Sequence, residues 1–271
     1  MRTSSIDGLP LRSSHTTIIK SVMRRVSFSW IGSVAMGTLV LHAQTPSPTN
    51  AAPSAPLSIQ IVPSGNYSAD PKEGAKQRAY EAMNMMLNKN LDGALANLDD
   101  AIKLDPDAIM PYVMRSEVHA RRKEWDAAET DINTALRLRP ENPLVQLNAA
   151  DLKLRRGQFS EARASYQTMT PTSATADLIS YRIFLCDLGL KKTKDAEQEL
   201  AAFTDDKTPG YNFAHAAWAL DQGQAQQAVP FLKLALQQHP RQALIIYFAG
   251  LEWLGYLPLL KVVTDPNTIG I

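Results

Sequence analysis

The chain has 271 residues, of which 45% are apolar, and its 28 Lys and Arg against 27 Asp and Glu give a net charge of +1. This near-neutral balance excludes a strongly basic surface of the kind that binds nucleic acid, so no nucleic-acid partner is expected. The single cysteine excludes a disulfide framework within the chain and a zinc site built from cysteines. Cys186 lies in the apolar stretch IFLCDLGL, which predicts a small buried residue rather than a reactive thiol.

Residues 1–43 are predicted to be a targeting segment. Arg24 and Arg25 precede an uncharged, mostly apolar run from Val26 to Leu41, and a polar stretch follows it. This order is typical of a secretory signal, and the run lies just below the roughly 17 to 25 residues that cross a bilayer. A start at Met23 would give a signal that ends at Ala43. We expect export to the periplasm or the cell exterior; the alternative is an uncleaved anchor that holds the protein at the inner membrane, facing the periplasm.

Residues 44–71 are rich in Pro, Ser and Ala and poor in large apolar residues. Such a composition buries too little apolar surface to offset the entropy of ordering the chain. We therefore expect a disordered linker between the targeting segment and the rest of the chain.

A sequence pattern recurs at a fixed interval of about 34 residues beyond the linker. The segment DGALANLDDAIKLDP ends at Pro106, and the similar segment DAAETDINTALRLRP ends at Pro140. Alanines recur at the same spacing, and later copies of the pattern repeat them: Ala94, Ala101, Ala128, Ala135, Ala162, Ala228 and Ala235. A fixed period of this length predicts stacked structural units, because one unit alone leaves its apolar face uncovered.

The pattern resembles the tetratricopeptide repeat, most closely in residues 109–142. There Tyr112 fills the aromatic position, Ser116 the small position and Trp125 the start of the second helix, and Pro140 ends the unit. The resemblance implies an all-α, right-handed superhelical solenoid of about five helical hairpins and a C-terminal capping helix. The repeat domain would cover residues 72–244, with units near 75–108, 109–142, 143–174, 176–205 and 209–242, the fourth degenerate.

Residues 242–264 contain a nearly continuous apolar segment, QALIIYFAGLEWLGYLPLLK. We expect a hydrophobic helix that packs on the last repeat. The alternative is a membrane span, which would place Glu252 near the centre of the bilayer and Pro258 inside a helix. The segment has more apolar residues than one end of a solenoid requires, so it also predicts contact with a second copy or another protein.

The sequence offers no set of residues for catalysis. It contains no Gly-rich phosphate loop, no nucleophile elbow and no histidine pair with metal-ligand spacing. His119 falls where the repeat has Tyr, which predicts a packed side chain. Neither enzyme activity nor a cofactor or metal is expected.

The resemblance implies that the first helix of each hairpin lines a concave groove. The repeat register assigns the following partner-binding residues to this groove: Met83, Met86, Met110, Val113, Glu117, Arg121, Leu147, Asp151, Arg155 and Phe213. Glu117 with Arg121, and one unit later Asp151 with Arg155, have the spacing of ion pairs along a helix. They are either ordinary surface pairs or a polar ladder that orients a peptide. The acidic residues in this groove would repel an acidic peptide tail.

These features predict a non-enzymatic protein-protein interaction scaffold in an exported compartment. Its partner would be an apolar peptide, a helix or another protein, bound on the concave face. The alternative is a structural subunit of a membrane-associated assembly, anchored by its N-terminal or C-terminal hydrophobic segment. The C-terminal helix is also a candidate contact for a homo-oligomer.

Overall fold

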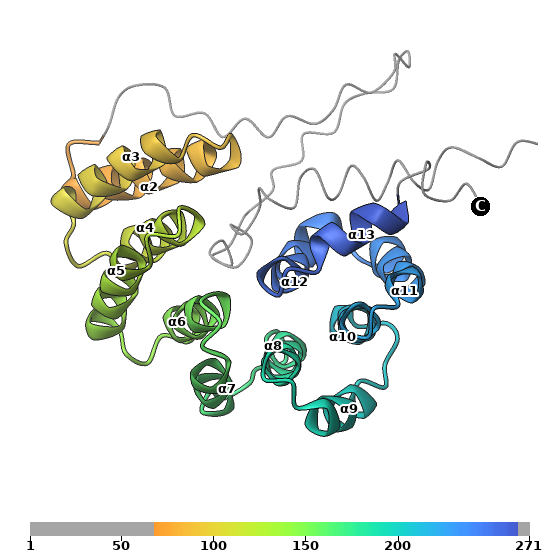
Figure 1. Cartoon of the computed structure of the whole chain (residues 1–271). Coiled ribbons are helices and arrows are strands. Elements are labelled where there is room, and N and C mark those ends of the chain that lie inside the picture. Colours follow the sequence, from red (N-terminus) through yellow and green to blue (C-terminus); the bar gives the residue numbers. More distant parts are fainter. Residues whose placement is uncertain (1–67, 265–271) are drawn as a thin grey trace, which may run out of the picture.

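The computed structural model describes residues 68–264, so the predicted targeting segment and nearly all of the predicted linker lie outside the described residues. All regular secondary structure in the described chain is helical, as predicted (Figure 1). Its helices are α2 (Pro71–Leu87), α3 (Leu91–Leu104), α4 (Ile109–Arg121), α5 (Trp125–Leu138), α6 (Pro143–Arg155), α7 (Phe159–Gln167), α8 (Ala176–Gly189), α9 (Thr193–Ala202), α10 (Pro209–Asp221), α11 (Ala225–Gln238), α12 (Arg241–Trp253) and α13 (Leu257–Thr264).

The helices pack in consecutive pairs that stack along a curve. Helices α2 and α3, α4 and α5, α6 and α7, α8 and α9, and α10 and α11 contact one another as hairpins. The first helices α4, α6, α8 and α10 line the inner side of the curve, and their partners α5, α7, α9 and α11 lie outside (Figure 1). The inner side is therefore the concave face that the sequence pattern assigned to partner binding.

The recurring alanines explain how closely each pair of helices approaches. Ala94, Ala128, Ala162, Ala196 and Ala228 have no exposed surface, and each lies in the first turns of the second helix of its hairpin. A larger side chain at these positions would push the paired helices beyond the usual spacing of roughly 8 to 10 Å. The hairpin α8–α9, whose sequence fits the repeat pattern poorly, keeps this alanine.

The turns inside the hairpins repeat as regularly as the alanines. Left-handed backbone conformations occur at Lys89, Lys123, Gly157, Lys191, Gly223 and Gly255. The interval between these positions is constant as far as Lys191, and it is slightly shorter after that residue. The left-handed residue lets the last carbonyls of the first helix be capped before the second helix begins.

The turn at Gly255 divides the segment that the sequence predicts as one C-terminal helix, so that prediction is wrong. Helix α12 ends where the Tyr256 amide donates to the Leu251 carbonyl over 2.9 Å, the long-range bond of a helix C-cap. Pro258 then stands at the second position of α13, where its missing N–H costs nothing. Within residues 68–264, no helix has the length and apolar character needed to cross a membrane.

We predict that the residue at each left-handed position, lysine or glycine, affects the stability of the whole protein. Replacing Lys123 with glycine removes the strain of a side chain at φ 62° and should stabilise the fold by about 0.5 to 1 kcal/mol. Gly223→Ala should destabilise it by about 1 kcal/mol, although an added Cβ there meets nothing within 4 Å. Denaturant unfolding of both variants measures this difference. An unchanged midpoint for Gly223→Ala would contradict the assigned turn.

Candidate partner-binding surface

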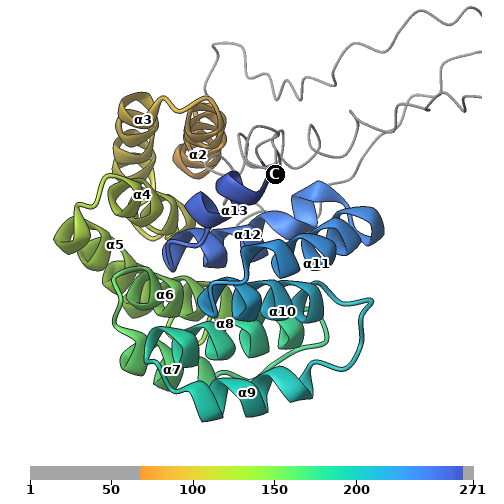
Figure 2. The same cartoon turned by 45° about the vertical axis from the view of Figure 1, so that its right-hand side comes forward.

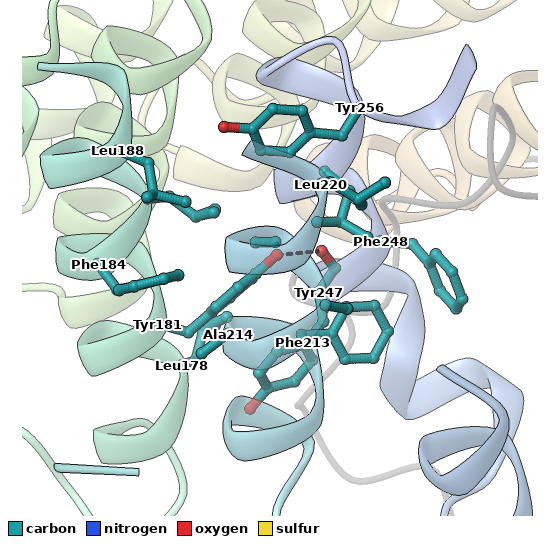
Figure 3. Close-up of a cluster of buried hydrophobic side chains, with 14 of the residues drawn as sticks. Leu178, Tyr181, Phe184, Leu188, Phe213, Ala214, Leu220, Tyr247, Phe248 and Tyr256 are labelled. Carbon is teal, nitrogen blue, oxygen red and sulfur yellow. Dashed lines mark hydrogen bonds between the residues drawn. The ribbon is translucent and has the colours of Figure 1, made fainter. Parts of the chain in front are cut away.

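Helix α12 fills part of the concave face. It lies on the inner side of the curve against α8 and α10 (Figures 1 and 2). Phe213, predicted to line the groove, has no exposed surface, because its ring packs edge-on against Phe248 of α12 with 4.7 Å between ring centres. Figure 3 shows Phe213 and Tyr181 together with Tyr247 and Phe248 in this core. A partner therefore has no access to Phe213, and the prediction for this residue is wrong.

A buried arginine of α8 connects three helices. Arg182 has no exposed surface; its Nε donates to Asp151 Oδ1 of α6 over 2.9 Å, and its Nη2 donates to the carbonyl of Ile246 in α12 over 2.8 Å. Its guanidinium carbon lies 4.5 Å from the centre of the Trp253 ring. A buried charge needs such partners, because desolvation alone would be very costly. The repeat pattern did not single out Arg182; the available signal was one cation in the apolar stretch SYRIFLCDL.

Tyrosine hydroxyls add further contacts that hold α12 in place. Tyr181 donates to the carbonyl of Tyr247 over 3.2 Å (Figure 3), and Tyr247 itself donates to Asp177 Oδ2 over 2.6 Å. The Gly210 amide donates to the same oxygen over 2.8 Å. Asp177 thus links the start of α8 to both α10 and α12, so the position of α12 is specified by polar contacts as well as by apolar burial.

One of the two predicted ion pairs along a helix forms. Glu117 accepts from Arg121 Nε over 2.7 Å, as predicted, and also from Arg155 Nη1 over 3.1 Å. Asp151 does not pair with Arg155. It is 3% exposed and accepts from Tyr166 Oη and from Arg182, while Arg155 reaches across to α4. The concave face therefore carries one carboxylate shared by two arginines in place of a two-step ladder.

The predicted groove residues fall into two groups. Met83, Met110, Glu117, Arg121 and Arg155 are partly exposed on α2, α4 and α6; we call these five residues the open face. The buried group packs in the core: Met86, Val113, Leu147, Asp151 and Phe213. Met86, 2% exposed, lies between the first hairpin and α4, so its assignment to a groove surface is also wrong.

A small cleft lies beside the open face, where α4 and α6 meet the end of α12. Its lining residues are Val113, Ser116, Glu117, Ala120, Asn148, Asp151, Leu152, Arg155 and Trp253. Its volume of about 20 Å³ suits a single small group. Sites for cofactor-sized molecules are usually roughly 300 to 1,000 Å³. The cleft therefore has room for about one water molecule and is too small for a cofactor.

Other candidate chemistry on the described residues is limited. No group of three or more His, Cys, Asp or Glu within residues 68–264 has an arrangement that could hold a metal ion. Cys186 is buried, as predicted, and burial raises the pKa of its thiol to about 12. His119 Nδ1 lies 2.6 Å from Glu124 Oε2 on the hairpin α4–α5. None of these side chains provides a nucleophile at the cleft.

We predict that Gly250 is required for α12 to reach α8. An added Cβ at this position would lie 2.5 Å from Leu185 Cδ1 and 2.6 Å from Arg182 Nη1. Gly250→Ala should therefore destabilise the protein by about 1 to 3 kcal/mol and change the Trp253 fluorescence. In the control Gly74→Ala, the Cβ meets its nearest atoms at 3.4 Å, so helix propensity should dominate and stability should be kept or raised. Equal stability of both variants would contradict the close approach of α12.

We also predict strong coupling between Arg182 and Asp151. Arg182→Met leaves a buried carboxylate without its cation and should cost about 3 to 5 kcal/mol. Combining it with Asp151→Leu removes both charges and should recover a large part of that loss. A double-mutant cycle in denaturant measures the coupling; additive losses would show that the pair does not hold the helices together.

Comparison with known proteins establishes the fold alone. No family model and no curated protein matches the sequence. Among solved structures, PilF of Pseudomonas aeruginosa aligns with a TM-score of 0.51 at 14% identity, over 71% of this chain and 90% of that one. PilW, a widely conserved type IV pilus biogenesis factor, aligns with a TM-score of 0.51 at 20% identity, over 70% of this chain and 90% of PilW. YrrB, a TPR protein with an unusual peptide-binding site, aligns with a TM-score of 0.42 at 18% identity, over 65% of this chain and 91% of YrrB. The chain is therefore similar in fold to solenoids of the tetratricopeptide-repeat type.

Proposed function

We propose that the protein is a non-enzymatic interaction scaffold that binds an apolar peptide, helix or partner protein on its open face, in an exported compartment. The observation that carries this proposal is the division of the concave face. Helix α12 covers α8 and α10, whereas the inner surfaces of α2, α4 and α6 keep partly exposed side chains beside a cleft.

The open face suits an apolar partner with some freedom of shape. Met83 and Met110 are half-buried, and Met110 belongs to none of the core clusters of residues 68–260. Methionine side chains are flexible and polarizable, so they adapt to irregular apolar surfaces. An amphipathic helix laid in such a groove places its apolar side chains at helical spacing. The adjacent arginines and Glu117 would then fix its orientation.

The compartment is proposed from the sequence. Two arginines followed by an uncharged, mostly apolar run favour export. The same run favours the second candidate, a subunit of a membrane-associated assembly anchored at its N-terminus; carbonate extraction of membranes distinguishes an anchored from a released protein. We do not propose anchoring or self-association through the C-terminal segment, because Leu244, Tyr247, Phe248 and Leu251 are buried inside the chain.

We predict that charging the open face abolishes partner binding. The double substitution Met83→Asp and Met110→Asp should reduce recovery of partners from a periplasmic fraction at least about tenfold, equivalent to ~1.4 kcal/mol. Circular dichroism checks that the helices are retained. The control Leu104→Asp changes an apolar residue that is 40% exposed on α3, outside the open face, and should keep normal recovery. Undiminished recovery with the double variant would remove the open face as the binding surface.

A further inference from the structure

Tyr80 of the first hairpin is exposed at a repeat position where the later units are buried. Met114, Asn148 and Arg182 follow it at intervals of 34 residues, and they are 4%, 7% and 0% exposed. Met114 packs in the core of the hairpin α2–α3, and Arg182 donates to α6, so this position faces the preceding unit. Tyr80 is 55% exposed, because within residues 68–264 no unit precedes α2, at the end of the curve (Figure 1).

The side of α2 around Tyr80 is more polar than the same side of later units. We call Gln77, Tyr80 and Asn84 the end face, since their spacing of three and four residues places them together on the helix. One unit later, the buried residues Pro111 and Val118 occupy the positions of Gln77 and Asn84. A further hairpin stacked on α2 would require apolar residues there. Side-chain amides beside an aromatic ring suit an extended backbone better, because its N–H and C=O groups need partners.

The chain that leads into α2 already lies beside the end face. The Ser68 amide donates to Gln77 Oε1 over 2.9 Å, although α2 begins only at Pro71. A Cβ added at Gly74 would lie 3.4 Å from the Ser68 carbonyl oxygen, so the chain passes close to the first turns of α2. From Ser68 to Pro71 the chain therefore runs antiparallel to α2. The same path, continued back from Ser68, leads to Tyr80, one turn beyond Gln77.

Residues 57–67, LSIQIVPSGNY, directly precede the described chain and belong to the predicted linker. Leu57, Ile59 and Ile61 alternate with polar residues, so an extended conformation places these three apolar side chains on one side. When extended, the segment spans up to roughly 36 Å, whereas α2 beyond Gln77 is roughly 15 Å long. Because the segment is attached to α2, its effective concentration is about millimolar, which favours it over a second copy.

We propose that residues 57–67 pack as an extended segment on the end face and cover the ring of Tyr80. The contact would cap the solenoid, whose terminal unit otherwise exposes a surface made for stacking. It would also reduce the free linker to residues 44–56. The proposal is independent of partner binding, because the end face and the open face share no residue.

Hydrogen exchange of the full chain, followed by mass spectrometry, tests this contact. The amides of residues 57–62 should exchange at least about tenfold more slowly than those of residues 44–56. Tyr80→Asp should remove this protection, while circular dichroism shows that the helices remain. In denaturant unfolding, Tyr80→Asp should destabilise the chain no further once Ile59→Asp and Ile61→Asp are present, because the contact is then already lost.

The matched control is Leu259→Asp, which changes another apolar residue, 41% exposed, on α13. It should leave the protection of residues 57–62 unchanged. Unprotected amides in the wild-type chain, or protection that survives Tyr80→Asp, would overturn the proposal. Protection that rises with protein concentration, together with a dimer mass in light scattering, would assign the end face to a second copy and would also overturn it.

Discussion

One guanidinium group with no exposed surface determines how this solenoid closes. Arg182 of α8 donates to the Asp151 carboxylate of α6 and to the Ile246 carbonyl of α12, and it lies over the indole ring of Trp253, also in α12. Three helices from different units therefore meet at this side chain. Desolvating an arginine is expensive, and these partners offset much of that cost, although Nη1 is buried without a hydrogen-bond partner among the described residues. Because two of them come from α12, that helix contacts α8 as well as its neighbour α10. The concave face is thereby divided into a filled part and an open part.

The spacing of the turns changes where the curve closes. Left-handed residues are evenly spaced up to Lys191 and lie closer together beyond it. The first shorter interval contains the connection from α9 to α10, residues 203–208, which is shorter than the connection from α7 to α8, residues 168–175. In the second, only His239 and Pro240 separate α11 from α12. Because these units are shorter, less chain is available to place α12 away from the inner side of the curve. Gly250 has no side chain, so α12 can approach Leu185 and Arg182 closely.

The sequence was sufficient for features that depend on local spacing. The recurring alanines predicted the hairpins, and the pair of Glu117 with Arg121 follows from helix geometry alone. Asp151 was assigned to Arg155 by the same rule, but its partner Arg182 lies in the next hairpin, and the burial of that partner depends on where α12 packs. The prediction that Phe213 lines the groove was wrong for the same reason, because the position of α12 determines whether Phe213 is buried. A repeat register gives the spacing along each helix, but it does not show that α12 turns onto the inner side and contacts α8, past the hairpin α10–α11.

The contacts of α12 with helices outside the neighbouring hairpin couple distant parts of the solenoid. In a regular solenoid each unit touches only its neighbours, so a partner on one end says little about the other. Here Trp253 of α12 shares a cleft with Val113 and Glu117 of α4, although the hairpins α6–α7, α8–α9 and α10–α11 lie between them in the chain. A partner that bound there only when α12 is packed in place would stabilise this packing, by an amount set by its concentration and its affinity. In the proposed function, α12 would therefore form one wall of the binding site.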